Sequence, residues 1–224
     1  INFYYKQDTY DMIYISKHAN TSRCEYLKYL FLLIFISCSV TSSGVVMNDN
    51  GYEKAYFAGG CFWCMEPPFE AMEGVIEATS GYMGGTTENP TYEEVTTGET
   101  GHAEVVEILF DPKTVTYEEL LEVFWRNIDP TALNYQFADV GSQYRTEIFT
   151  VGSEQKDLAE QSKVELENSG KFDKPIVTAI SEAPAFYIAE EYHQDFYKKQ
   201  SMRYQMYAKA SGRKGFLEDT WGED

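Results

Sequence analysis

Basic side chains, histidine and cysteine are all scarce in this sequence. Its 224 residues contain 18 Lys and Arg against 36 Asp and Glu, a formal net charge of −18, with three His and four Cys. That balance argues against a nucleic-acid-binding protein, because phosphates attract Lys and Arg. A hydrated, soluble surface explains the acidity. The chain also lacks a long apolar run: residues 29–36 are too few to span a bilayer, which takes about 20 residues.

The short apolar run lies between three basic residues and the small residues 37–39. This order is typical of a secretory signal, and residues 35–38 resemble a bacterial lipobox with Phe where Leu is usual. A lipid on Cys38 would hold the protein at a membrane surface without a span. We predict a leader over 1–38 and an extracytoplasmic protein, periplasmic or membrane-anchored. The alternatives are a buried N-terminal helix and, if 1–38 is no true leader, a cytoplasmic protein.

The rest of the chain is long enough for one substantial domain. The sequence is 43% hydrophobic and 16% aromatic, which argues against disorder. Residues 39–51 are polar and small, as in a linker. We expect the domain to cover 52–213, with a tail over 214–224. After Met202 the sequence is aromatic and polar without a clear period.

Two cysteines lie three residues apart in the stretch Ala-Gly-Gly-Cys-Phe-Trp-Cys-Met-Glu, residues 58–66. With Cys24 and Cys38 in the leader, no other thiol is left to pair with Cys61 and Cys64. The stretch follows an alternating apolar run and precedes a helical pattern, so Cys61 should lie at a helix N-terminus, which favours a thiolate. Two buried core cysteines are the plainer alternative, but C-x-x-C is a recurrent redox spacing.

Strand and helix patterns alternate along the domain. Pro67 and Pro68 are expected to make the start of the first helix irregular or 3₁₀, with regular helix from about Glu66. Two capping boxes, Thr91 with Glu94 and Thr116 with Glu119, mark helix starts. We predict strands over 53–58, 75–82, 102–110, 144–151 and 176–180, and helices over 62–72, 91–98, 116–127, 153–168 and 190–199.

The short 91–98 helix aside, the first six elements run strand, helix, strand, strand, helix, strand. This order is typical of the α+β class with a ferredoxin-like split βαβ core, β-α-β-β-α-β, whose helices cover one face of a mostly antiparallel sheet. An additional C-terminal helix, strand and helix would extend that core.

One predicted strand carries a carboxyl group among large apolar side chains. Alternation puts Glu104 on the same face as Val106, Ile108 and Phe110. A buried carboxyl resists ionisation and can hold a proton near neutral pH. The alternative, which alternation alone leaves equally open, is a Glu that points to solvent at the edge of the sheet.

A metal site is not expected. His102 and His193 lie too far apart in the sequence to suggest a zinc site together with the C-x-x-C pair.

An ordered series of motifs resembles the A-type peptide methionine sulfoxide reductases. The resemblance runs from about Tyr52 to Arg213, nearly the whole domain. It rests on Gly-Cys-Phe-Trp at 60–63, Ser-Gly-Tyr-Met-Gly-Gly at 80–85, Asn-Pro-Thr-Tyr at 89–92, Thr-Gly-His-Ala-Glu at 100–104, Asp-Pro at 111–112, Phe-Trp at 124–125, Asp-Pro-Thr at 129–131 and Gly-Ser-Gln-Tyr-Arg at 141–145.

The resemblance implies roles for individual residues. Cys61 is similar to the nucleophile that attacks the sulfoxide sulfur, and Glu104 to the acid that protonates the sulfoxide oxygen. Some family members carry a resolving cysteine in a Gly-rich tail; this tail has none, so that role falls on Cys64 or on an external thiol. The implied substrate-binding residues are Phe62 and Trp63 around the methyl group, Tyr92, Tyr144 and Tyr204 near the oxygen, and Asp139 as the orienting acid.

The implied reaction reduces methionine S-sulfoxide, free or in proteins, through a Cys61 sulfenic acid that Cys64 converts to a disulfide. A thioredoxin-type dithiol would reduce the disulfide, with no metal or organic cofactor. Two other functions stay open. The first is a thiol–disulfide oxidoreductase that uses the C-x-x-C pair alone. The second is a lipoprotein binding module with a structural Cys61–Cys64 disulfide.

Overall fold

The computed structural model describes residues 51–222. The predicted leader, and all of the predicted linker except Gly51, lie outside these residues. Within the described part, no helix is long and apolar enough to cross a membrane.

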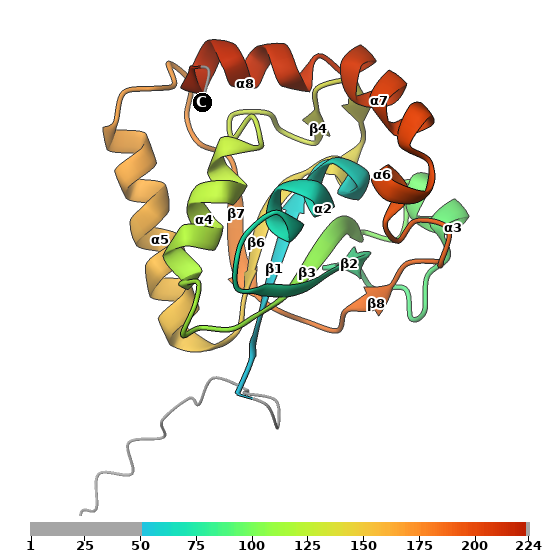
Figure 1. The fold of residues 1–224 in the computed structure, drawn as a ribbon, viewed down its shortest axis with the longest axis horizontal. Helices are drawn as coiled ribbons and strands as arrows, with labels where there is room; N and C mark the ends of the chain where they lie inside the picture. The colour runs from blue at the N-terminus through green and yellow to red at the C-terminus, as the bar shows by residue number, and fades with distance from the viewer. Residues whose placement is uncertain (1–50, 223–224) are drawn as a thin grey trace, which may run out of the picture. The chain divides into compact units, whose positions relative to one another are not determined.

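A six-stranded sheet forms the centre of the fold, in the order β7-β6-β1-β3-β2-β8 (Figure 1). Neighbouring strands are antiparallel, except that β6 and β7 are parallel. A separate pair, β4 with β5, is antiparallel. The strands are β1 (Glu53–Gly59), β2 (Val75–Met83), β3 (Ala103–Phe110), β4 (Tyr135–Gln136), β5 (Asp139–Val140), β6 (Thr146–Thr150), β7 (Ala179–Glu182) and β8 (Tyr187–Ile188).

The helices alternate with the strands along most of the chain, which confirms the predicted α+β class. Both predicted capping boxes are present, Thr91 with Glu94 and Thr116 with Glu119. The helices are α2 (Phe62–Glu70), α3 (Tyr92–Thr96), α4 (Tyr117–Arg126), α5 (Gly152–Asn168), α6 (Phe196–Lys199), α7 (Ser201–Ala210) and α8 (Arg213–Trp221), with a 3₁₀ turn at Ser142–Tyr144.

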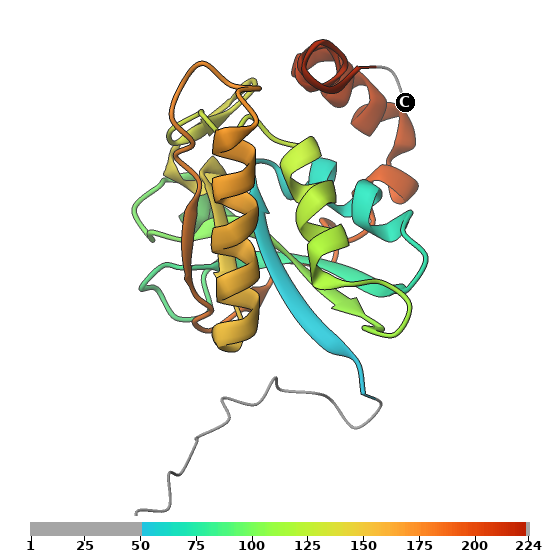
Figure 2. The same ribbon diagram turned by 90° about the vertical axis from the view of Figure 1, so that its left-hand side faces the viewer.

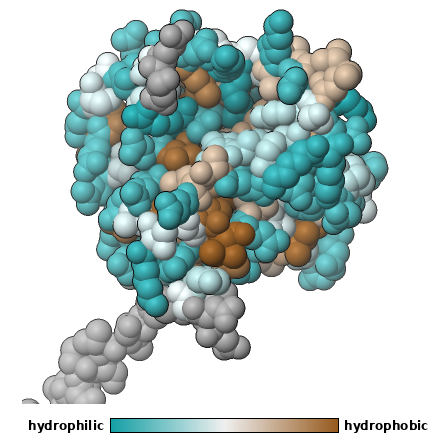
Figure 3. All heavy atoms as spheres, in the orientation of Figure 1, coloured by the Kyte–Doolittle hydropathy of each residue, from teal (hydrophilic) through white to brown (hydrophobic). Residues whose placement is uncertain are grey.

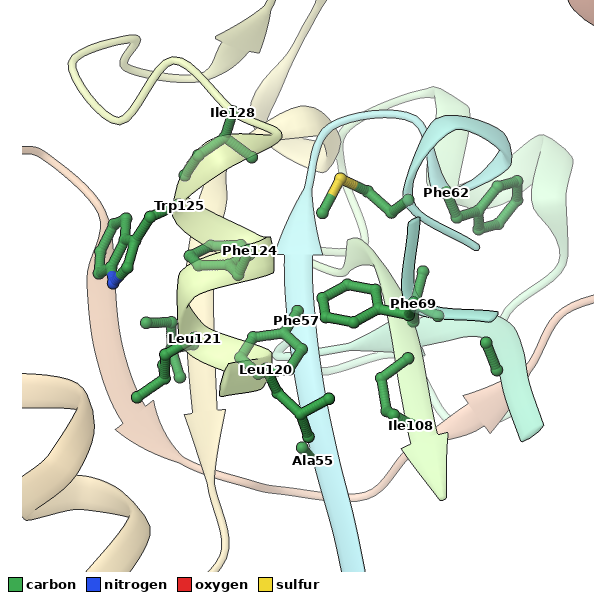
Figure 4. Close-up of a cluster of buried hydrophobic side chains, with 14 of the residues drawn as sticks. Ala55, Phe57, Phe62, Phe69, Ile108, Leu120, Leu121, Phe124, Trp125 and Ile128 are labelled. Atoms are coloured by element: carbon green, nitrogen blue, oxygen red, sulfur yellow. The ribbon is translucent and has the colours of Figure 1, made fainter. Parts of the chain in front are cut away.

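The main core lies between the sheet and the helices α2, α4 and α5 on one of its faces (Figure 2). Phe57 of β1 stacks on Phe69 of α2 and on Phe124 of α4, each with ring centroids 5.1 Å apart (Figure 4). Burial of these large rings, together with the aliphatic side chains around them, stabilises the helices on the sheet.

A smaller apolar cluster covers the opposite face of the sheet. Ala58, Val105 and Phe149 contribute to it, and Phe186, from the segment before β8, packs against it. Both faces of the central strands are therefore buried. The outer surface in the view of Figure 3 is mostly hydrophilic, as the net charge requires, with hydrophobic residues gathered near its centre.

Three local predictions differ from the structure. Helix α2 is regular from Phe62 and not from Glu66, and it runs through Pro67 and Pro68, because burial of Phe62, Met65 and Phe69 holds its face on the sheet. The expected 3₁₀ character is confined to its entry, where the N–H of Cys64 donates to the carbonyl oxygen of Cys61 at 3.0 Å. The helix expected over 190–199 is reduced to Phe196–Lys199.

The third difference concerns the C-terminal segment, where the sequence predicted no helix or strand after residue 199. Residues after Met202 continue helix α7 and form α8, and most of the expected tail is helix α8. Neither helix has an apolar stripe that sequence periodicity could reveal. The last predicted strand is shifted to Ala179–Glu182.

Candidate active site

The turn between β1 and α2 carries the first cysteine. Gly60 has a φ of +85°, and a Cβ there would lie 2.5 Å from the Cβ of Gln136, so only glycine fits this backbone. Cys61 follows as the N-cap residue of α2. The sequence prediction that Cys61 lies where a strand meets a helix N-terminus is confirmed.

Cys61 opens on a small pocket of about 180 Å³. Seven of the nine residues with predicted roles line it, although they come from five different parts of the chain. The lining residues are Cys61, Phe62, Trp63, Tyr92, Glu104, Asp139, Tyr144 and Tyr207. The fold therefore brings together most of the site that the motifs indicated.

Glu104 is the carboxyl group of this pocket. It is 2% exposed, so the reading that puts it at a solvent-facing edge is wrong and the buried one is confirmed. Burial raises its pKa to about 8, although the hydrogen bond from the backbone N–H of Phe62 opposes the shift. Glu104 consequently carries a proton at neutral pH and can donate it.

The two cysteines are free, buried thiols, 6% and 4% exposed. Burial raises the pKa of Cys61 well above its ordinary value, and its hydrogen bond to Cys64 raises it further. The same hydrogen bond lowers the pKa of Cys64, and the nearby charge of Arg213 contributes. The expected Cys61 thiolate is therefore wrong for the resting protein: Cys61 holds the proton and Cys64 is the more acidic thiol.

Phenol groups and one more carboxyl group complete the pocket. Burial and nearby negative groups raise the pKa values of Tyr92, to about 12, and of Tyr144, so both hydroxyls keep their protons. The hydroxyl of Tyr207 donates to Oδ2 of Asp139. Burial also raises the pKa of Asp139, against the opposing effects of Tyr207 and Arg213.

Two residues with predicted roles lie outside the pocket lining. Tyr204 and Cys64 line a separate cavity of about 780 Å³ with Arg213, Lys214 and Trp221. The tyrosine of α7 that reaches the pocket is Tyr207, one helical turn further on. The sequence prediction names Tyr204, whereas the structure places Tyr207 at the pocket; α7 has no apolar period from which the orientation of the two could be predicted.

Sequence reasoning missed two residues that support the pocket wall. The indole Nε1 of Trp63 donates to Nδ1 of His193 at 3.1 Å, and His193 is 1% exposed. Glu190 accepts from the hydroxyl of Tyr82 and from the backbone N–H of Tyr92, each at 2.9 Å. Both lie in the segment that was predicted to be a helix. In the sequence, Glu190 and His193 could have been noticed as two polar residues within an aromatic segment.

No three His, Cys, Asp or Glu side chains within residues 51–222 are placed to hold a metal ion. His102 has a structural role: its Nδ1 accepts from the N–H of Gly85, and its Nε2 lies 2.8 Å from the carbonyl oxygen of Thr87.

A reactive cysteine pair beside a protonated acid performs reduction, so the fold and the site define a thiol-dependent oxidoreductase. The family model "Peptide methionine sulfoxide reductase" matches residues 53–224. The chain belongs to the peptide methionine sulfoxide reductase family, of type A, and is an enzyme of the oxidoreductase class.

Curated relatives match over almost their whole length. The MsrA of Listeria welshimeri is 54% identical over 175 residues, 78% of this chain and 99% of the relative. The MsrA of Bacillus licheniformis is 55% identical over 170 residues, 76% of this chain and 94% of the relative.

Solved structures agree with this assignment. Reduced Mxr1 of Saccharomyces cerevisiae has a TM-score of 0.62 at 32% identity, covering 69% of this chain and 89% of that chain. Methionine sulfoxide reductase A of Corynebacterium diphtheriae has a TM-score of 0.61 at 34% identity, covering 72% and 81%. The predicted family and the predicted enzyme class are both confirmed.

Proposed function

We propose that this protein reduces methionine S-sulfoxide, free or in proteins, by direct attack of Cys61 on the sulfoxide sulfur. The observation that carries the proposal is the placement of the Cys61 thiol and the protonated Glu104 in one small aromatic pocket. A sulfoxide oxygen is a poor leaving group until it receives a proton. A thiol alone would not suffice, and this site offers a proton donor as well.

The pocket residues divide between the two ends of the substrate. Phe62 and Trp63 provide apolar rings for the methyl group and the side chain of the substrate. The hydroxyls of Tyr92 and Tyr144 are donors for the oxygen, where negative charge develops as the S–O bond breaks. Asp139 orients the hydroxyl of Tyr207 in the same pocket. Preference for the S epimer follows from the resemblance to type A enzymes.

The first step transfers one oxygen atom. The sulfur of Cys61 bonds to the sulfoxide sulfur while Glu104 protonates the oxygen and regains a proton from the Cys61 thiol. The protonated oxygen then moves to the Cys61 sulfur: the S–O bond of the substrate and its bond to Cys61 break, the S–O bond on Cys61 forms, and methionine leaves. Cys61 ends as a sulfenic acid. Cys64 then attacks the Cys61 sulfur, which forms the disulfide and releases water. Support for Cys64 comes from its thiol hydrogen bond with Cys61 and from its position three residues on.

A dithiol reductant of the thioredoxin type would return the enzyme to its starting state, because two electrons are needed to open the disulfide. No metal or organic cofactor takes part in this scheme.

Single-turnover incubation of the reduced protein with each epimer of methionine sulfoxide tests the proposal. One methionine per protein from the S epimer, with a Cys61–Cys64 bridge in peptide mapping, is the expected result. No methionine from either epimer would overturn the function. Methionine without the bridge would overturn only the role of Cys64.

We also propose that the core is of the ferredoxin-like split βαβ type. The order β6-β1-β3-β2, with each neighbouring pair antiparallel, supports this. Superposition of these four strands with α2 and α4 on a ferredoxin-like domain tests it; a mismatch in strand order or direction would contradict it.

The extracytoplasmic location remains a proposal that rests on residues 1–38. Expression of the full chain in a bacterium, followed by fractionation and mass spectrometry of the N-terminus, tests it. A product that begins at Cys38 and carries a lipid supports the anchor, and Cys38→Ser is the matched control. An unprocessed product in the cytoplasm would contradict both the leader and the predicted boundary at residue 38.

A further inference from the structure

Arg213, the first residue of α8, is a buried cation. It is 7% exposed, and no carboxylate of the described residues lies within ion-pair distance of it. Its Nη2 donates to the carbonyl oxygen of Gly59 at 3.0 Å and its Nη1 to that of Asn127, while Nε has no partner. A buried charge is costly unless an opposite charge compensates it. The neighbourhood of Arg213 should therefore contain an anion.

Cys64 is the group that can supply this anion, because Glu218, the carboxyl group of the same cavity, pairs with Lys214 at 3.3 Å. Arg213 and Cys64 line the same cavity, and Nη1 of Arg213 lies 3.4 Å from the sulfur of Met65, the residue next to Cys64. The positive charge of Arg213 also acts on the Cys64 thiol and favours its ionised form. Asp139 feels the same charge, but it belongs to the pocket of Cys61 and already accepts from Tyr207.

Several other ionisable groups face Cys64. They are Cys61 at the start of α2, Glu104 of β3, Asp139 of β5, and Tyr204 and Tyr207 of α7. Arg126, Lys214 and Glu218 lie around the shared cavity. The cysteine, the two carboxyl groups and the two tyrosines that act on Cys64 are all neutral or negative. Arg213 is therefore the cation that acts on Cys64 directly.

We propose that Arg213 is the counter-ion of Cys64 and holds its sulfur as a thiolate in both steps where that sulfur carries charge. The proposal rests on the role of Cys64 as the resolving cysteine. Arg213 acts through Cys64 and touches no substrate atom, so it is a positioning residue. It also gives α8 a part in the redox centre, although this helix contains no cysteine.

The first of these steps is resolution. The Cys64 thiolate attacks the sulfur of the Cys61 sulfenic acid; the S–S bond forms, the S–O bond breaks, and the oxygen leaves as water after it takes up one proton. A thiolate is the reactive form of cysteine, so the rate at neutral pH depends on how much Cys64 is ionised.

The second step is reduction of the disulfide by an external dithiol. One thiolate of the reductant attacks the sulfur of Cys61, the S–S bond breaks, and Cys64 leaves as a thiolate beside Arg213. The second thiolate of the reductant then breaks the mixed disulfide, and Cys61 takes up a proton. A more acidic thiol leaves faster, which favours attack at Cys61 over attack at Cys64.

Two substitutions separate charge from shape. Arg213→Gln keeps an amide donor for the buried carbonyl groups without the charge, and Arg213→Lys keeps the charge. In single turnovers from pH 6 to 10, the rate of the first methionine release is the internal reference against which disulfide formation is compared in each variant. Disulfide formation by Arg213→Gln should be about tenfold slower at pH 7, the effect of one pKa unit, and recover towards pH 10. Arg213→Lys should stay within about threefold of wild type.

An equal loss of disulfide formation at every pH, or an equal loss in both variants, would show a structural role and overturn the proposal. If the variants do not fold, a measurement on the wild-type protein tests the proposal instead. The ordinary pKa of cysteine is about 8.5. Iodoacetamide should label Cys64 in the folded full-length chain well below that pH, as measured by peptide mapping. Labelling only above that pH contradicts the proposal. Methionine without any Cys61–Cys64 bridge in wild type would instead remove the proposed role of Cys64.

Discussion

The backbone N–H of Phe62 donates to Oε2 of Glu104 at 3.0 Å. This bond joins the residue after Cys61 to the carboxyl group on β3, 42 positions along the chain. The first turn of α2 has unpaired N–H groups, and one of them holds this carboxyl group instead of a helical carbonyl. The position of the Glu104 carboxyl group relative to Cys61 is therefore fixed through the backbone of the helix start.

Glu104→Gln should lower single-turnover methionine formation by about 10²- to 10⁴-fold, the usual contribution of a general acid. The amide oxygen can still accept from Phe62, so the fold of α2 should be preserved. Exchange with a small disulfide should stay near the wild-type rate, because that reaction has no oxygen to protonate. The two rates are measured on the same reduced protein.

Glu77→Gln, an exposed position on β2, is the matched control and should leave both rates unchanged. Equal loss of both reactions in Glu104→Gln would favour a general thiol–disulfide oxidoreductase that needs Glu104 only for structure.

The tyrosines of α7 give a second prediction. Tyr207 lines the pocket and donates to Asp139, whereas Tyr204 lines the other cavity. Loss of the Tyr207 hydroxyl leaves Asp139 without the donor that holds it in the pocket, and a misplaced site group can cost about 10²-fold in rate. Tyr207→Phe should therefore lower kcat for methionine sulfoxide by at least about tenfold, and Tyr204→Phe by less than about threefold. The opposite ranking in steady-state kinetics would restore Tyr204 as the site residue.

Trp63 has its indole N–H fixed by His193 and its ring stacked on Phe196 at 3.8 Å. His193→Phe leaves that N–H without its acceptor, whereas His193→Asn can supply an oxygen in its place. We expect the Phe variant to raise KM for methionine sulfoxide about tenfold with a smaller change in kcat, and the Asn variant to raise it less. A larger rise in KM for the Asn variant than for the Phe variant would show that the ring itself, and not the hydrogen bond, supports Trp63.

Local signals in the sequence predicted the elements that local physics controls. The capping boxes at Thr91 and Thr116 each satisfy their own helix start, so they could be recognised without knowledge of the fold. The alternation on β3 placed Glu104 among apolar side chains, but only the layer of helices above it decided that this face is buried. Propensity failed at Pro67, where packing of α2 on the sheet outweighs the loss of a helical hydrogen bond.

The rest of the site depends on contacts over long sequence distances. His193 contacts Trp63 across 130 positions of the chain and lies in the turn before α6. Tyr207 and Arg213 lie on α7 and α8, two helices without an apolar stripe. The thiolate prediction for Cys61 failed for a related reason. The helix N-terminus was visible in the sequence, but the burial that raises the pKa of Cys61 comes from residues of β3, α7 and α3 around it.

Glu66 of α2 should make folding stability depend on pH. Its side chain is fully buried, accepts from the hydroxyl of Ser80 at 2.7 Å, and has its pKa raised by burial from 4.5 to about 7. The native state thus binds more protons than the unfolded state between these values. Its contribution is fully present below pH 4.5 and is lost as pH rises through about 7. Glu104 acts in the same direction, up to about pH 8.

Glu66→Gln removes the contribution of Glu66 to the pH dependence of folding stability, because a neutral amide has no proton to lose. Wild type should lose roughly 2 kcal/mol more of its unfolding free energy than Glu66→Gln does between pH 5 and pH 8. Urea unfolding of the reduced proteins at pH 5, 6.5 and 8 measures the difference, with Glu77→Gln as an exposed control. Parallel pH profiles for wild type and Glu66→Gln would mean that Glu66 is ionised in the native state, with a buried negative charge in α2 that the fold must then compensate.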